Sequence, residues 1–125
     1  RITEDELERL EAQVRHTEGV VAAGGSPVDT DIAFLDQVAA ATHNLALLLA
    51  RGPVSALMRA GYAAIAPQLP QSGARLLEVH RQLLSSLRRR DPAATEAVMR
   101  RHLSDYRRGC EVAGMDMSQP IPPDR

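Results

Sequence analysis

The chain has 125 residues, enough for one domain with a modest core, and 44% of them are apolar. Aromatic residues make up only 2% and Trp is absent, so aliphatic side chains must build the core, which suits closely packed helices. A formal net charge of −1 argues against a general binder of polyanions, and a single cysteine excludes an internal disulfide bond and fits a reducing compartment.

No apolar segment approaches the ~20 residues that a membrane-spanning helix needs. The best candidate, "LALLLA" at residues 45–50, is too short and ends at Arg51. The chain begins in a charged stretch that has none of the features of a signal peptide. We therefore predict a soluble, cytoplasmic protein.

The first helix has a clear start. Thr3 followed by Glu6 is a capping-box pattern, in which each side chain bonds the other residue's backbone N–H. Apolar residues then recur at helical spacing and predict a helix over about 4–16. Gly24, Gly25 and Pro27 predict a loop over residues 18–30 after it.

The second helix is predicted from its acidic start. Asp29 and Asp31 suit the positive end of a helix dipole, and Thr30 is a candidate N-cap. His43 and Asn44 interrupt the pattern, so this helix ends near residue 42 and Asn44 can cap the next one.

Four further helical segments follow. Gly52-Pro53 is expected to divide residues 45–66 into two helices, because proline is comfortable only in a first turn. A leucine-rich helix is predicted over about 74–90, and Asp91-Pro92 begins a last one that ends near residue 112. We therefore predict an all-α fold, an antiparallel helical bundle of about six helices.

Three ligand-type side chains lie on otherwise apolar helix faces. His80 sits among leucines, His102 follows Val98 and Met99, and Asp31 projects toward the face of the second helix that is apolar. Carboxylate and neutral imidazole are ordinary ligands of Zn, Ni, Mn or Fe. The alternative is that the histidines are hydrogen-bonded core residues and that the acid only favours a helix N-terminus.

The chain resembles the FCD class, the effector-binding domain of GntR-family bacterial transcription regulators. That family has an Asp, two residues, then Phe-His, and an Asn ten residues after the Phe. Asp31, Phe34 and Asn44 stand here in that register. The family also has a His in a leucine-rich helix and a second His within the following alanine-rich helix, as His80 and His102 are placed here.

The resemblance covers most of residues 2–112 and implies how the protein is organised. Residues 1–114 would form an FCD-like domain and residues 115–125 a flexible tail. The family's first helix and its DNA-binding winged helix-turn-helix domain are not recognisable in this sequence, so DNA would be bound only through a domain outside it. A homodimer is expected.

The resemblance also implies a site. In this family an Asp and three His residues commonly bind a divalent metal that helps to hold a small carboxylate effector, so Asp31, His80 and His102 become candidate ligands of Zn, Ni or Mn. Leu35 stands where the family has its first His, and it and Arg101 are candidate effector contacts, since a guanidinium matches a carboxylate.

Leu35 leaves alternatives open. His43 cannot replace the missing ligand, because it lies about 12 Å further along the helix and off that face. A metal-free pocket with a more apolar effector, or a ligand-free helical dimerisation module, would also fit. An enzyme is not expected, because no general base stands beside the candidate ligands. We interpret the arginine runs, with acids interspersed, as solvated helix faces.

Overall fold

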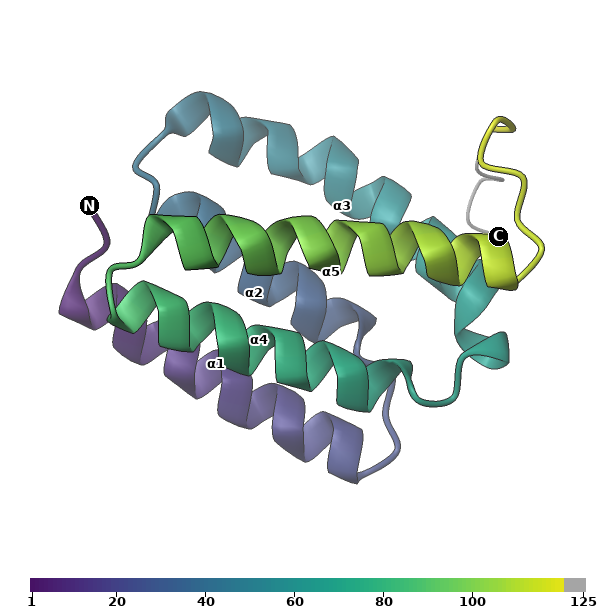
Figure 1. Cartoon of the computed structure of the whole chain (residues 1–125), viewed down its shortest axis with the longest axis horizontal. Coiled ribbons are helices and arrows are strands. Elements are labelled where there is room, and N and C mark those ends of the chain that lie inside the picture. Colours follow the sequence, from purple (N-terminus) through teal and green to yellow (C-terminus); the bar gives the residue numbers. More distant parts are fainter. Residues whose placement is uncertain (121–125) are drawn as a thin grey trace.

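The computed structural model describes residues 1–120 as a bundle of five α-helices and one short 3₁₀ helix, with no strand in that part of the chain (Figure 1). The elements in chain order are α1 (Glu4–Ala22), α2 (Val28–Ala40), α3 (Leu45–Ile65), η1 (Ala66–Gln68), α4 (Ser72–Arg88) and α5 (Pro92–Val112). The prediction of an all-α bundle is confirmed, with five α-helices in place of about six. The predicted tail extends beyond Pro120, outside the described residues.

The helix starts depend on short polar side chains. The Thr3 hydroxyl accepts from Glu6 N–H at 3.3 Å, and Glu6 Oε2 accepts from Thr3 N–H at 2.8 Å, so the predicted capping box is formed. Asn44 Oδ1 accepts from the backbone of α3 at 3.1 Å, as expected. The prediction for Thr30 is wrong, because Thr30 lies inside α2, where its hydroxyl donates to the Pro27 carbonyl at 2.7 Å.

The predicted break at Gly52-Pro53 is also wrong, because α3 continues through it to Ile65. Pro53 has no N–H, so the carbonyl of Leu49 loses its helical donor. Leu49 is 69% exposed, and Gly52 and Pro53 are exposed as well. The proline therefore lies in a solvent-exposed stretch of the helix and not in the apolar interior, which lowers its free-energy cost.

The core lies between α1, α2 and α4. It consists of aliphatic side chains from the first and fourth helices around one phenylalanine of the second, namely Leu7, Leu10, Val14, Phe34, Leu77, Leu83 and Leu84. Helix α4 packs between α1 and α5, and α2 packs against α1 and α3 (Figure 1). Helix α5 buries only Cys110 completely, and it contacts α3 only slightly. Helices α3 and α5 are therefore the outer elements of the bundle.

None of the helices within residues 1–120 combines the length and the apolarity that crossing a membrane would require.

Candidate functional site

A buried acid and a buried imidazole meet inside the bundle. Asp31 comes from the first turn of α2 and His80 from the middle of α4, and Oδ1 of Asp31 lies 2.9 Å from Nε2 of His80. The His80 side chain has no exposed surface and that of Asp31 has 4%. Phe34, one turn beyond Asp31, stacks on the His80 ring with centroids 4.1 Å apart and planes 10° from parallel. Helical spacing thus brings both partners of His80 to the same side of α2.

His102 of α5 approaches the same carboxylate. Its Nε2 lies 3.9 Å from Oδ1 of Asp31, which is too far for a hydrogen bond, and its side chain is 13% exposed. Burial lowers the pKa of His102, while the Asp31 carboxylate opposes this shift and His80 adds to it. The structure thus brings together the three side chains that the sequence singled out, around one carboxylate oxygen.

Two buried polar atoms near this junction have no hydrogen-bond partner. Within the described part of the chain, Nδ1 of His80 and the hydroxyl of Tyr62 are buried without a hydrogen-bond partner. Burial raises the pKa of Tyr62, although the nearby Ser72 side chain works in the opposite direction. A buried polar atom without a partner costs about 1–3 kcal/mol, so such atoms need an explanation in a native structure.

The two tyrosines were missed by the sequence analysis. Tyr62, near the end of α3, and Tyr106 of α5 line a hollow of about 910 Å³ together with His102. Burial and the neighbouring Cys110 thiol raise the pKa of Tyr106 to about 12. A signal was present in the sequence, because these are the only two tyrosines of a chain that contains one Phe and no Trp.

The mouth of the hollow carries charge. Arg101 is exposed, lines the hollow and donates from Nη2 to Oε1 of Gln82 at 2.8 Å. Arg75 and Arg108 also line it, and Arg75 lies 3.9 Å from Asp105. Leu35 is elsewhere: it is partly buried and packs against the core, and it does not line this hollow. Arg101 therefore borders this hollow, and Leu35 does not.

His43 takes no part in the site, as expected. It is exposed in the turn between α2 and α3, in a left-handed conformation with φ of 55°. Its Nε2 lies 2.8 Å from Oε1 of Glu6, so the ring ties this turn to the start of α1.

The donor set fits a metal ion poorly. Across residues 1–120, the Asp, Glu, His and Cys side chains form no group of three or more that could hold a metal ion. The Oδ1 atom of Asp31 is already hydrogen-bonded to His80, and Leu35 offers no donor atom. The arrangement is that of a buried carboxylate that is hydrogen-bonded to the His80 imidazole and lies near the His102 imidazole.

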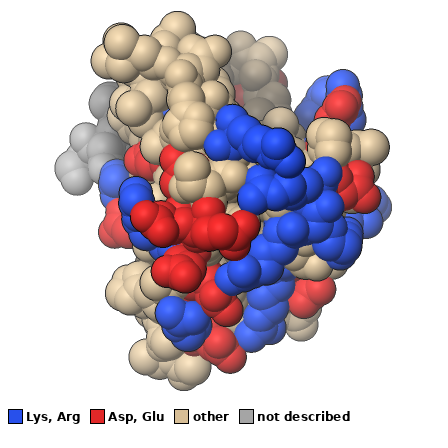
Figure 2. Space-filling view, turned by 90° about the vertical axis from the view of Figure 1, so that its left-hand side faces the viewer, with Lys and Arg blue, Asp and Glu red and all other residues tan. Residues whose placement is uncertain are grey.

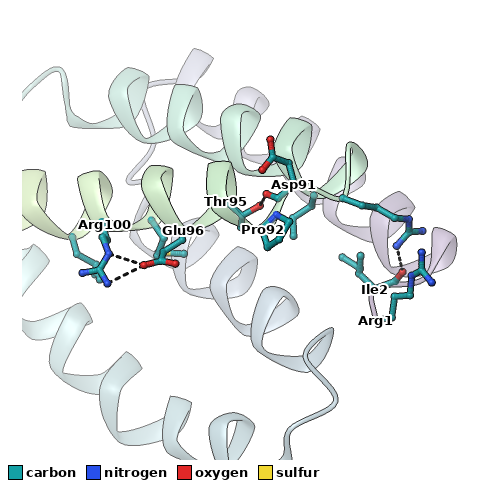
Figure 3. Close-up of a pocket in the computed structure, with 11 residues that line it drawn as sticks. Arg1, Ile2, Asp91, Pro92, Thr95, Glu96 and Arg100 are labelled. Carbon is teal, nitrogen blue, oxygen red and sulfur yellow. Dashed lines mark hydrogen bonds and ion pairs between the residues drawn. The ribbon is translucent and has the colours of Figure 1, made fainter.

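A second hollow, of about 800 Å³, lies between the N-terminus and the first turns of α5. Its walls are largely apolar, and several of its polar groups already have partners (Figure 3). Glu96 binds Arg100 at 2.9 Å, and the Thr95 hydroxyl donates to the Asp91 carbonyl at 2.8 Å. It therefore offers less to a polar ligand than the hollow beside His102 does.

The family model of the FCD domain matches residues 1–105, which include α1 to α4 and the part of α5 that carries His102. The chain belongs to the FCD domain family, the effector-binding domains of GntR-type transcription regulators. Searches among curated proteins and solved structures found no significant match.

Proposed function

We propose that this domain senses a small organic acid in the hollow beside His102 and acts as a homodimer to control DNA binding by its regulator. The observation that carries the proposal is that Tyr62 lines this hollow and that its buried hydroxyl has no hydrogen-bond partner. A ligand that supplied the missing acceptor would stabilise one arrangement of the bundle over others. Only such a difference in affinity between states can shift an equilibrium.

The charges of the hollow suggest how an acid would lie in it. Arg101 at the mouth can take the carboxylate, because a guanidinium forms two parallel hydrogen bonds with it. The lowered pKa of His102 leaves this imidazole uncharged at neutral pH, so it can accept or donate one hydrogen bond to a neutral polar group. The inner end is thus suited to a hydroxyl or carbonyl group and the outer end to the negative charge.

The divalent metal stays a proposal. Asp31, His80 and His102 would hold it, and a bound Zn, Ni or Mn ion would attract the effector carboxylate as a Lewis acid. The Asp31–His80 hydrogen bond and the missing donor at Leu35 support the metal-free form of the site instead. We therefore favour a pocket that works without metal.

Thermal shift of the purified domain with a panel of organic acids, with and without EDTA, tests the function. We expect stabilisation by at least one acid that persists in EDTA and falls at least tenfold in apparent affinity in Tyr62→Phe and Arg101→Gln. Arg107→Gln, on the same helix, is the control. Stabilisation that disappears in EDTA would favour the metal form, and no response to any acid would contradict the sensing proposal.

A further inference from the structure

The hollow between the N-terminus and the first turns of α5 runs as a groove along α5. The residues of α5 that line it recur at helical spacing: Pro92, Thr95, Glu96, Met99, Arg100 and Leu103. A rise of about 1.5 Å per residue puts Pro92 and Leu103 about 17 Å apart along the helix axis. The groove is therefore long enough for an extended acyl chain.

The deeper part of this groove is apolar. Ile2, Leu87 and Met99 line it, and all three are partly buried and pack against the core. Leu103, which is 60% exposed, extends the apolar surface at the far end of the groove. The volume of about 800 Å³ lies within the range of roughly 300–1,000 Å³ that is usual for ligand pockets. Hydrocarbon that covered this surface would remove it from water, which is favourable.

One end of the groove is basic. Arg1 lines it there beside Ile2, as Figure 3 shows, and Arg90 donates from Nη1 to the Ile2 carbonyl at 2.8 Å. Arginine side chains gather into a patch on the end of the molecule that carries the N-terminus and the α4–α5 turn (Figure 2). An anionic group is therefore attracted to this end of the groove.

The two acids that line the groove already have partners. Oδ1 of Asp91 accepts from the backbone N–H of Ala94 at 2.9 Å and caps α5. Glu96 binds Arg100 at 2.9 Å, further along the helix. Both carboxylates are therefore engaged by groups of α5, and they oppose an anion at the basic end only weakly.

We propose that this groove binds a free carboxylic acid with a long acyl chain. The chain lies along α5 over Met99 and Leu103, and its carboxylate meets the guanidinium of Arg1, which matches a carboxylate in geometry. Each methylene that is fully buried raises the affinity about fourfold, so the chain supplies most of the binding and the basic end fixes its direction. The hollow beside His102 is different, because the buried Tyr62 hydroxyl there suits a small polar acid.

A lipid bilayer fits this groove less well than a single chain does. Helices that lie on a membrane insert apolar side chains that project from an exposed face. Ile2, Leu87 and Met99 are instead partly buried in a hollow. The occupant is therefore one acyl chain that enters the hollow.

The test is isothermal titration of the whole chain with dodecanoate below its micelle concentration, beside decanoate and dodecyltrimethylammonium. We expect saturable binding of dodecanoate, at least fivefold weaker binding of the shorter decanoate, and at least tenfold weaker binding of the cationic amphiphile. Leu103→Gln and Arg1→Glu should each weaken dodecanoate binding at least fivefold. Leu57→Gln, at a leucine of α3 that is 55% exposed, is the matched control. NMR of the methionine methyl groups should show a shift at Met99 on binding.

The proposal is overturned if dodecanoate does not bind saturably, if the cationic amphiphile binds equally well, or if Leu103→Gln binds as the wild type does. Loss of binding in Arg101→Gln but not in Arg1→Glu would place the acid in the hollow beside His102 and would also contradict it. Binding to anionic phospholipid vesicles without binding of free dodecanoate would mean a membrane surface instead. The sensing proposal depends on Tyr62 and Arg101, so the two proposals can fail separately.

Discussion

The junction of Asp31 and His80 and the exposed first half of α3 depart from the usual distribution of polarity in opposite directions. The first buries an acid and an imidazole completely, and the second leaves six aliphatic side chains in solvent. Each arrangement has a free-energy cost in an isolated domain. Buried polar atoms lose their hydration, and exposed apolar atoms remain in unfavourable contact with water. Helix α3 carries the exposed aliphatic side chains in its first half and Tyr62, which lines the hollow beside His102, in its second. The comparison teaches that one helix can carry both an exposed apolar segment and a residue that lines a hollow.

The largest expected effect is at the buried junction. Changing His80→Ala removes a stacked ring from beside Phe34 and leaves the Asp31 carboxylate buried without its hydrogen-bond partner. We expect it to lower the free energy of unfolding by about 3 kcal/mol, measured by urea denaturation. His43→Ala, at an exposed histidine that also faces a carboxylate, should change it by less than about 0.5 kcal/mol. Equal effects at the two histidines would remove the distinction between buried and exposed pairs.

Replacing both partners of the junction sharpens the same point. A buried hydrogen-bonded pair is destabilised more by the loss of one partner than by replacement of both with apolar residues. We expect the double variant Asp31→Leu/His80→Leu to be about 1–2 kcal/mol more stable than the sum of the two single variants predicts. Simple additivity in urea denaturation would show that the two side chains do not act as a pair.

The hydroxyl of Tyr62 gives a smaller effect of opposite sign. Because it has no hydrogen-bond partner, Tyr62→Phe should leave the free energy of unfolding unchanged or raise it by up to about 1 kcal/mol. Tyr106→Phe, whose hydroxyl lies beside the Cys110 thiol, should lower it slightly. A clear loss of stability in Tyr62→Phe would mean that this hydroxyl is satisfied in the protein, which would weaken the argument that it awaits a ligand.

The smallest effect is expected on the solvated surface, outside both regions. The Thr3 backbone N–H and the His43 ring lower the pKa of Glu6 from 4.5 to about 2. The stabilisation from this carboxylate is therefore present above pH 4.5 and is lost as the pH falls toward 2. Glu6→Gln should unfold with a weaker dependence on pH between 4.5 and 2 than the wild type does. Glu8→Gln, on the same helix, is the control and should follow the wild-type dependence.

Much of the fold could be predicted from local patterns. The caps at Thr3 and Asn44 and the leucine spacing of α4 are properties of a few neighbouring residues, and the structure agrees with each of them. The same spacing predicted that Asp31 and His80 face inward, because a residue on an apolar helix face follows that face into the core. The resemblance to the FCD class depended on these same positions.

Only the tertiary structure decided the rest. Gly52-Pro53 predicts a break that α3 does not have, because the cost of a proline depends on whether solvent reaches the freed carbonyl. Both α3 and α4 are rich in leucine, yet the leucines in the first half of α3 remain exposed and those of α4 are packed between two helices. The sequence by itself determined the capped starts of α1 and α3 and the apolar face of α4, since these depend on neighbours along the chain. Only the packed bundle decides which apolar helix faces are buried and which polar atoms are left without a hydrogen bond, because both depend on residues far apart in sequence.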